Sequence, residues 1–196
     1  TQAGTTTASR QTVLTGGSTL RAARLLREEL DAGKWLAELE GKEFYWEYLA
    51  KTDRMGADTP NQVSHVAYSY AAQVVLLDEE GRVERVVAAY DVGRVVNPKS
   101  AAGQIEGGVV MGLGYGLTED YPLKDAVPQA KYGTLGLWRA DMAPAIDVIL
   151  VKSKQEGEFA FGAKGVGELA TLPTAPAAAA AYYRLDSEFR TKLPIE

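Results

Sequence analysis

The segment NPKSAAGQIEGGVVMGLGYGL, residues 97–117, constrains the fold more than any other part of the chain. Asn97 followed by Pro98 is a typical helix start, because the Asn side chain caps free backbone amides and proline suits the first turn. Inside a helix each glycine costs up to roughly 1 kcal/mol relative to alanine, so this helix needs tertiary compensation. We therefore expect another part of the structure to pack very close to it. Its glycines are Gly103, Gly107, Gly108, Gly112, Gly114 and Gly116.

The N-terminal third of the chain predicts one further helix and a strand. Leucines and alanines recur at helical spacing over residues 19–32, with Ser18 as a suitable N-cap and Gly33 as a suitable stop. Residues 42–49, KEFYWEYL, are rich in aromatic side chains, which are common in strands. We therefore expect a strand there, joined to the next element by an irregular connection.

The clearest hairpin in the sequence lies in the middle of the chain. Residues 63–77 and 82–92 are rich in β-branched residues and flank a turn at 78–81. Downstream we expect, in chain order, a buried strand at 145–152, a helix in the alanine-rich run 175–183 after Pro173, and an edge strand at 188–194. One hairpin with scattered strands and interleaved helices favours an α+β fold over a regular doubly wound one.

Composition excludes several classes of site and partner. The chain has 196 residues, a formal net charge of -5 and no dense run of Lys and Arg, which weighs against a nucleic-acid partner. It has no cysteine and a single histidine, His65, which excludes thiolate and multi-histidine metal sites within it. No apolar run approaches the ~20 residues that span a bilayer, and the N-terminus lacks the apolar core of a signal peptide. We expect one domain or two small ones, in the cytoplasm.

A phosphate-binding loop is the first interpretation to test for the glycines and lysine of FGAKGVGE, residues 161–168. A Walker loop needs Gly-Lys followed by Ser or Thr, whereas here Gly165 follows the lysine. The dinucleotide pattern GxGxxG begins at Gly112 and Gly114, but Leu117 occupies its last position. Ordinary nucleotide binding is therefore disfavoured.

Glu168 directly follows this glycine-rich loop, which contains Gly162, Gly165 and Gly167. Glycine lets a ligand approach the backbone and allows a positive φ, so such a loop can aim its last side chain inward. A carboxylate flanked by Val166 and Leu169 in a mostly apolar loop can serve as a general base. The alternative is that Glu168 is an N-terminal residue of the following helix and interacts favourably with its dipole. The residues alone leave both interpretations open.

Three segments resemble the C-terminal part of the molybdenum-binding subunit of the xanthine dehydrogenase and aldehyde oxidoreductase family. They are TTASRQTVLTGGS (6–18), DVGRVVNPKSAAGQIEGGVVMGLGYGLTEDY (91–121) and FGAKGVGELATLPTAPA (161–177). Together with their spacing they cover nearly the whole chain. The resemblance implies that residues 1–196 are the C-terminal portion of a molybdopterin-binding domain, with a mixed sheet, a long hairpin and packed helices in an α+β fold.

The resemblance also implies a chemistry and a catalytic residue. In the family, molybdenum is held by the dithiolene of a pterin and binds no protein atom, so the lack of cysteine and histidine clusters is no objection. The family glutamate removes the proton from Mo–OH as the oxygen attacks an electron-poor carbon, and hydride passes to a sulfido ligand. Glu168 occupies that position. The implied cofactor is molybdopterin carrying molybdenum, in its cytosine dinucleotide form.

Further residues match family positions that contact this cofactor. The Gln104 amide suits the mixed donors and acceptors of the pterin, and the Arg10 guanidinium suits the phosphates of the dinucleotide extension. Lys164 stands where many relatives have a smaller residue, and a solvated loop lysine is an equal alternative for it. The implied cofactor-binding residues are Ser9, Arg10, Gln11, Gln104, Gly107, Gly108, Lys164, Gly165, Val166 and Gly167.

The chain departs from the family pattern in two respects. Many relatives have a proline within two residues of the catalytic glutamate, whereas here Leu169 and Ala170 follow it and the next proline is Pro173. This variation is most similar to the selenium-dependent xanthine dehydrogenase branch. The family subunit is also several times longer, so we expect a small subunit or a domain that does not turn over substrate alone. Its expected partners are the remaining molybdenum-domain chain and subunits that carry 2Fe-2S and FAD, and self-association stays open.

The function implied by the resemblance is oxidative hydroxylation of a purine, such as xanthine or hypoxanthine, by a molybdenum hydroxylase. An aldehyde oxidoreductase of the same family is the alternative substrate class. A non-catalytic assembly module that uses the same glycine surface to bind molybdopterin is an interpretation of another kind. The sequence therefore predicts an oxidoreductase and leaves its substrate open.

Overall fold

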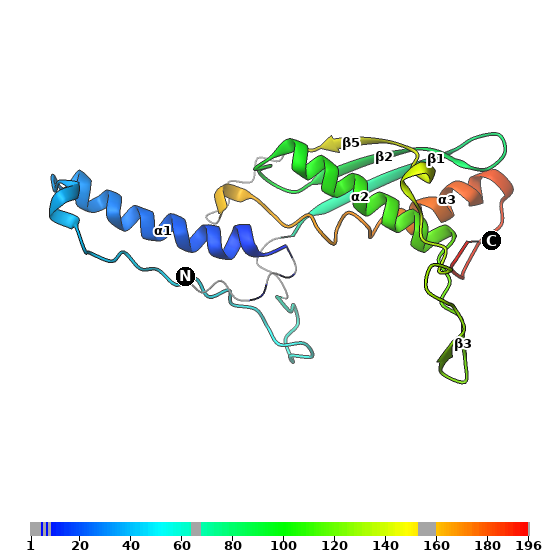
Figure 1. Ribbon diagram of the computed structural model, residues 1–196, viewed down its shortest axis with the longest axis horizontal. Coiled ribbons are helices and arrows are strands. Elements are labelled where there is room, and N and C mark those ends of the chain that lie inside the picture. Colours follow the sequence, from blue (N-terminus) through cyan, green and yellow to red (C-terminus); the bar gives the residue numbers. More distant parts are fainter. Residues whose placement is uncertain (1–4, 6, 8, 64–67, 153–159, 196) are drawn as a thin grey trace. The chain divides into compact units, whose positions relative to one another are not determined.

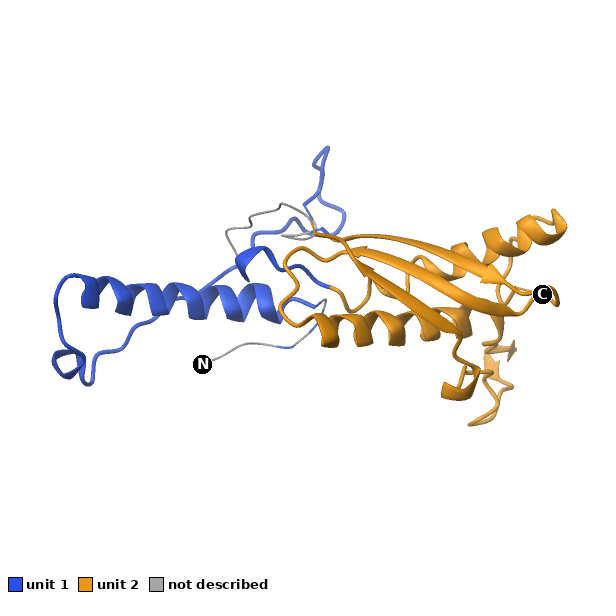
Figure 2. Ribbon diagram, turned by 90° about the horizontal axis from the view of Figure 1, so that it is seen from above, with its two compact units in different colours: residues 1–68, 154–165 blue, residues 69–153, 166–196 orange. Residues whose placement is uncertain are grey.

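The chain folds into two compact units. Unit 1 comprises residues 1–68 and 154–165, and unit 2 comprises residues 69–153 and 166–196 (Figure 2). Each unit has a hydrophobic cluster of its own. His65 lies outside the residues that the structure describes. The computed structural model describes residues 5, 7, 9–63, 68–152 and 160–195.

Unit 1 is built on helix α1 (Gln11–Asp31; Figure 1). The predicted start at Ser18 is wrong, because Ser18 lies inside the helix and its hydroxyl donates to the carbonyl of Leu14 at 3.0 Å. A serine that bonds back to the carbonyl four residues earlier does not cap free amides. The predicted end is confirmed, since Gly33 follows the helix with a φ of 92°, a conformation that suits glycine.

The rest of unit 1 contains short helices and irregular chain. Two 3₁₀ helices lie at Leu36–Leu39 and Ala160–Gly162. The strand predicted over residues 42–49 is wrong, because these residues have no regular secondary structure. Trp46 instead lies under the guanidinium of Arg21, 5.9 Å from the ring centroid. In this segment Trp46 therefore contacts α1, and no strand pairing occurs.

Unit 2 contains a three-stranded sheet in the order β1–β2–β5 (Figure 1). β1 (Tyr70–Leu77) and β2 (Val83–Asp91) pair antiparallel, which confirms the predicted hairpin. β5 (Ala145–Leu150) pairs parallel with β2 and confirms the strand predicted in this region. A parallel pair needs a long crossover, and helix α2 (Pro98–Leu117) forms part of it.

Helices α2 and α3 (Thr174–Asp186) pack against one face of this sheet. The cap predicted at Asn97 is confirmed, since its side chain accepts the N–H of Ser100 at 3.0 Å. Alternation along the strands turns every second residue toward the helices. The fully buried residues of this core are Val86, Ala88, Tyr90, Ile105, Val109, Leu113, Ala170 and Ala178. A mixed sheet with helices packed on it confirms the α+β fold class.

Short elements complete unit 2. The connection from α2 to β5 contains β3 (Leu123–Lys124), β4 (Val127–Pro128) and a 3₁₀ helix at Ala140–Met142. The edge strand predicted at 188–194 is wrong. Ser187 ends α3 in the left-handed conformation, and Asp186 pairs with Arg190 at 2.6 Å, so the chain turns where pairing was expected. None of the described helices is both long and apolar enough to cross a membrane.

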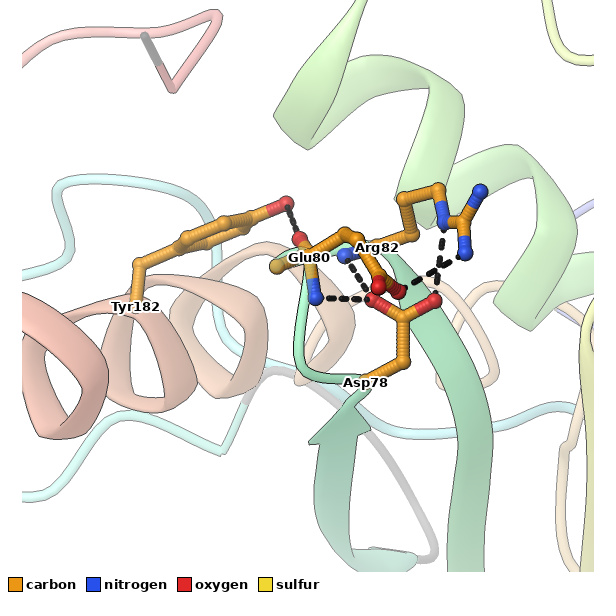
Figure 3. A network of polar contacts seen from close by, with 5 residues as sticks. Asp78, Glu80, Arg82 and Tyr182 are labelled. Atoms are coloured by element: carbon orange, nitrogen blue, oxygen red, sulfur yellow. Dashed lines mark hydrogen bonds and ion pairs between the residues drawn. The ribbon is translucent and has the colours of Figure 1, made fainter.

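Asp78 organises the turn between β1 and β2 (Figure 3). Its Oδ1 accepts the backbone N–H of Glu80 at 3.1 Å and that of Arg82 at 2.8 Å, and its Oδ2 accepts the Arg82 guanidinium at 2.8 Å. Tyr182 of α3 donates its hydroxyl to the carbonyl of Gly81 at 2.9 Å. The hairpin turn is therefore closed by one carboxylate and attached to α3 by one phenol.

Three glycines of α2 explain how tertiary packing offsets the low helix propensity of this segment. Gly108, Gly112 and Gly116 all lie on its buried face. A Cβ added to Gly108 would lie 2.3 Å from the Cβ of Ala170, and one added to Gly112 would lie 2.5 Å from the Cβ of Thr174. Real Cβ atoms do not approach so closely, so only glycine fits at these two positions. The predicted close approach is therefore confirmed, and the partner is segment 170–175.

The turn at Asp78 is expected to be sensitive to acid. The backbone N–H of Arg82, and then its guanidinium, lower the pKa of Asp78 below its usual 3.8. A carboxylate whose pKa is lower in the folded state stabilises the fold above 3.8 and loses that contribution as the pH falls through the lowered value. We expect the amide proton NMR shifts of Glu80 and Arg82 to titrate together with a midpoint below 3.8, and Asp78→Asn to abolish the titration. A midpoint at or above the usual value would contradict the assignment.

Two Gly→Ala changes in α2 are expected to affect stability in opposite directions. The methyl of Gly108→Ala would overlap Ala170, and overpacking of this kind costs about 1–3 kcal/mol. No atom lies within 4 Å of the methyl of Gly103→Ala, so the gain in helix propensity is about 0.5–1 kcal/mol. Urea unfolding of the full chain measures both free energies. Equal midpoints for the two variants would show that close packing at Gly108 does not stabilise unit 2.

Candidate functional site

A hollow of about 630 Å³ lies in unit 2 between α2 and the turn before α3. We call it the candidate pocket. Its volume falls within the roughly 300–1,000 Å³ that is usual for small-molecule sites. The hollow brings together two glycine-rich motifs that are far apart in the sequence. Its lining consists of Gly103, Gln104, Gly107, Gly108 and Met111 from α2, and of Gly167, Glu168 and Thr171 from the turn.

The α2 wall of the candidate pocket is open because some of its residues have no side chain. A Cβ added at Gly103 or Gly107 would meet no atom within 4 Å, whereas Gly108 uses its missing side chain to admit Ala170. Gln104 lies between the two open glycines and is exposed. Its amide can donate and accept hydrogen bonds at the pocket. A ligand can therefore reach both bare backbone and one amide on this wall.

Glu168 provides the carboxylate of the turn wall, where it is exposed. The backbone N–H of Thr171 donates to the Glu168 carbonyl at 3.3 Å, which closes the turn. Helix α3 begins only at Thr174 and has no acidic residue in its first turn. The alternative that Glu168 is an N-terminal residue of that helix is therefore wrong.

Ala170 ties this turn to the core of unit 2. It is fully buried, and its carbonyl accepts the Tyr90 hydroxyl at 2.9 Å and the Gln73 amide at 3.3 Å. Gln73 also donates to the Tyr90 oxygen at 2.5 Å. Burial raises the pKa of Tyr90, an effect that the Gln73 amide partly offsets. The phenol therefore stays protonated and remains a donor at neutral pH.

The glycine-rich motif before Glu168 is divided between the two units. The expected positive φ occurs at its first glycine, Gly162 (81°), together with Ala160 (48°) and Phe161 (55°), and these residues belong to unit 1. Gly167 lines the candidate pocket in unit 2, and Val166 packs against the core of that unit. The left-handed turn therefore starts the motif, while Ala170 fixes its end.

The other predicted cofactor residues lie in unit 1. Arg10 is exposed just before α1, and its guanidinium donates to the carbonyl of Thr5 at 2.9 Å. The side-chain oxygen of Gln11 accepts the hydroxyl of Thr15 at 3.0 Å. Lys164 is half-buried. The predicted residues that belong to unit 1 are Ser9, Arg10, Gln11, Lys164 and Gly165.

Unit 1 has a larger hollow of about 820 Å³ between α1 and residues 44–48. Among the described residues that line it, Glu47 is the one carboxylate, and Gln104 and Glu168 line the candidate pocket instead. We assign function to the smaller hollow because it combines a carboxylate with open backbone. Within the described ranges, no group of three His, Asp or Glu residues is placed to hold a metal ion.

Comparison with known families identifies the family to which the chain belongs. The chain matches the molybdopterin cofactor-binding domain over residues 35–144, which is more than half of its length and includes every α2 residue of the pocket. The chain belongs to this family. More broadly, it is a molybdopterin cofactor-binding domain of the xanthine dehydrogenase and aldehyde oxidoreductase type.

Two curated relatives of this molybdopterin cofactor-binding domain are equally similar in sequence. A probable xanthine dehydrogenase subunit of Bacillus subtilis is 31% identical over 148 residues, which cover 70% of this chain and 19% of the relative. The aldehyde oxidoreductase molybdenum-binding subunit PaoC of Escherichia coli is 31% identical over 107 residues, covering 53% of this chain and 15% of the relative. The chain thus spans less than a fifth of the length of either protein.

A solved structure shares the fold of this domain. The crystal structure of quinoline 2-oxidoreductase from Pseudomonas putida 86 superimposes with a TM-score of 0.53 and 24% sequence identity. The match covers 58% of this chain and 15% of that one. It confirms the fold, a mixed arrangement of helices and sheet.

Sequence reasoning missed several residues that the structure places at or behind the pocket. Met111 and Gly103 lie within one turn of Gly107 and Gln104, so the i, i+3 and i+4 spacing of a helix could have found them. A different pattern in the sequence could have identified Gln73. It is a polar residue at an inward position of the apolar strand YAAQVVLL, and such residues are buried only with hydrogen-bond partners.

Proposed function

We propose that this domain serves a molybdenum hydroxylase that hydroxylates a purine such as xanthine at an electron-poor carbon, with Glu168 as the base. The observation that carries the proposal is that the Glu168 carboxylate and the bare backbone at Gly107 line one hollow. The relative named as part of a xanthine dehydrogenase supports a purine as substrate. The relative named as an aldehyde oxidoreductase has the same identity, which makes an aldehyde the second candidate.

The residues of the candidate pocket fit a molybdopterin. At Gly103 and Gly107 the helix offers backbone with no atom within 4 Å of where a side chain would start, so a flat ring can lie against it. Gln104 between them offers both a donor and acceptors, as a pterin edge requires. A hollow of about 630 Å³ leaves room for such a group beside Glu168.

The residues of this chain would perform three tasks around that group. The bound molybdenum cofactor supplies the two-electron oxidation of the substrate carbon. Glu168 accepts the proton from the oxygen that attacks this carbon, so it must lie within hydrogen-bond reach of that oxygen. Gln104, Gly107 and Gly108 bind and orient the pterin.

The remaining family positions are proposed as further contacts of the cofactor. Arg10 is exposed at the N-terminus of α1, where a guanidinium and backbone amides favour the phosphates of a cytosine dinucleotide form. Ser9 and Gln11 flank it, and Lys164, Gly165, Val166 and Gly167 would line the metal. Acid hydrolysis of the purified cofactor would release CMP from this form.

The domain is proposed to work only within a larger complex. Because it spans less than a fifth of the relatives described above, the rest of a molybdenum subunit and components carrying 2Fe-2S and FAD are its expected partners. Visible absorbance of a copurified complex detects both groups. Elemental analysis of the same sample for molybdenum and selenium tests the assignment to the selenium-dependent branch, which requires both elements.

Glu168→Gln is the direct test of the proposed base. In the assembled complex we expect turnover to fall by ~10²–10⁴, because a general base contributes about that much, while molybdenum and pterin contents stay unchanged. Glu106→Gln is the matched control, since Glu106 is exposed on α2 but does not line the candidate pocket. Near-normal turnover of a fully loaded Glu168→Gln complex would refute the role. Assays with xanthine and with an aldehyde in parallel decide the substrate class.

Gly107→Leu tests whether the open wall of α2 binds the cofactor. No atom lies within 4 Å of the Cβ that this change adds, and leucine is a better helix former than glycine, so unfolding of the full chain should be unchanged or slightly more difficult. The side chain would fill the space beside Gln104, and we expect the molybdenum and pterin contents of the complex to fall sharply. Gly107→Ala, with its smaller side chain, should give an intermediate loss. Full cofactor content in a folded Gly107→Leu complex would contradict the proposed binding wall.

A further inference from the structure

Ala170 is the residue of the Glu168 turn that contacts both α2 and the sheet, while Leu169 packs on the core and the Thr171 hydroxyl donates to the Met111 sulfur at 3.9 Å. The Cβ of Ala170 occupies the space left by Gly108, where an added Cβ would lie only 2.3 Å away. Its carbonyl accepts hydrogen bonds from Tyr90 at 2.9 Å and from Gln73 at 3.3 Å. Ala170 therefore cannot shift without breaking packing on α2 and hydrogen bonds to the sheet.

The direction of these hydrogen bonds is fixed by the acceptor. The carbonyl of Ala170 can only accept, so the Tyr90 hydroxyl must donate to it. The Tyr90 oxygen in turn accepts the Gln73 amide at 2.5 Å. Reversing the amide would turn its oxygen toward the Ala170 carbonyl oxygen and the Tyr90 oxygen, neither of which can donate to it while the Tyr90 hydrogen points at Ala170. Gln73 of β1 and Tyr90 of β2 therefore bond to each other, and both donate to the one carbonyl at the turn.

Gln73 and Tyr90 are placed to act together. In the register of the hairpin, Gln73 lies opposite Ala88 and Tyr90 lies opposite Ala71, so the two are diagonal neighbours on the inward face. Tyr90 is fully buried, and Gln73 is partly buried. Burying polar groups on this otherwise apolar face is costly unless they are hydrogen-bonded. The Tyr90 hydroxyl and the Gln73 amide nitrogen both donate to the carbonyl of Ala170, while Gln73 Oε1 is buried with no hydrogen-bond partner among the described residues.

We propose that Tyr90 and Gln73 are positioning residues, which hold the turn 167–171 on α2 and thereby set the place of the Glu168 carboxylate at the candidate pocket. Neither residue lines the pocket, so both act through the turn. The link from turn to catalysis rests on the proposed function of Glu168. The link from Tyr90 to the turn does not, and it can be measured separately.

The same unit contains a matched control for the Tyr90 bond. Tyr182 also donates its hydroxyl to a backbone carbonyl at 2.9 Å, but the acceptor is Gly81 in the hairpin turn between β1 and β2 (Figure 3). Tyr90→Phe and Tyr182→Phe therefore each remove one phenol oxygen and one bond of the same length. In Tyr90→Phe the turn before α3 loses a hydrogen bond, whereas in Tyr182→Phe the hairpin turn between β1 and β2 loses one.

Hydrogen exchange of the full chain tests the structural step. Tyr90→Phe should accelerate exchange of the Thr171 and Thr174 amides, which close the turn before α3, by roughly fivefold, as expected for one lost hydrogen bond. Tyr182→Phe should accelerate the amide of Gly81 instead and leave the turn before α3 unchanged. Unchanged exchange at Thr171 in Tyr90→Phe would overturn the proposal.

Steady-state kinetics of the assembled complex test the functional step. Tyr90→Phe should lower kcat roughly tenfold or more with KM nearly unchanged, because a displaced base affects the chemical step. Tyr182→Phe should keep the kcat of the parent. In a Glu168→Gln background, Tyr90→Phe should cause no further loss, since the group that it positions is already gone. Losses that multiply in the double variant would show that Tyr90 does not act through Glu168.

Two outcomes separate this inference from the proposed function. If Glu168→Gln retains turnover while Tyr90→Phe still loosens the turn, the base assignment fails and the attachment by Tyr90 stands. If Glu168→Gln abolishes turnover while Tyr90→Phe leaves both exchange and kcat unchanged, the positioning role fails alone. Gln73→Met is the milder variant should Tyr90→Phe not fold, because the bond from Tyr90 to Ala170 remains. It should shift exchange and kcat in the same direction by smaller factors.

Discussion

The direct contact between the backbone of α2 and segment 170–175 is the constraint on which the rest of unit 2 depends. At Gly108 and Gly112 there is no room for even one added carbon, because the Cβ atoms of Ala170 and Thr174 already occupy that space. Close packing of this kind restores the stability that a glycine-rich helix loses. It also fixes how deeply the start of α3 sits on α2. The turn that bears Glu168 immediately precedes this contact, so its place follows from the packing.

The glycines of α2 serve two purposes on two faces of one helix. Gly108 and Gly112 admit another part of the chain, and Gly108 also borders the candidate pocket, whereas the space beside Gly103 and Gly107 in that pocket is used by no atom. With 3.6 residues per turn, neighbouring glycines such as Gly107 and Gly108 point in different directions. Adjacent positions can therefore contribute to stability and to ligand binding independently. Substituting one should affect the fold, and substituting the other should affect the site.

Ala170 couples the core to the candidate pocket. Its methyl group belongs to the packing against α2, and its carbonyl belongs to the hydrogen bonds from Tyr90 and Gln73. The sheet has no residue in the pocket wall, yet it contacts the turn through this carbonyl. A change in the hairpin can thus reach the Glu168 carboxylate without altering any residue that a ligand touches.

The sequence alone determined the local features, because they depend on neighbouring residues. The start of α2 at Asn97, the hairpin around Asp78 and the candidacy of Glu168 all followed from side-chain type and spacing. The sequence failed where composition is ambiguous: residues 42–49 are rich in aromatic side chains but form no strand, and Trp46 among them contacts Arg21 of α1. Only the tertiary structure decided at which glycines of α2 another part of the chain occupies the side-chain space and at which that space is open. Only it showed that the Tyr90 hydroxyl bonds to the turn before α3. Both depend on contacts between residues far apart in the chain, whose burial no local pattern records.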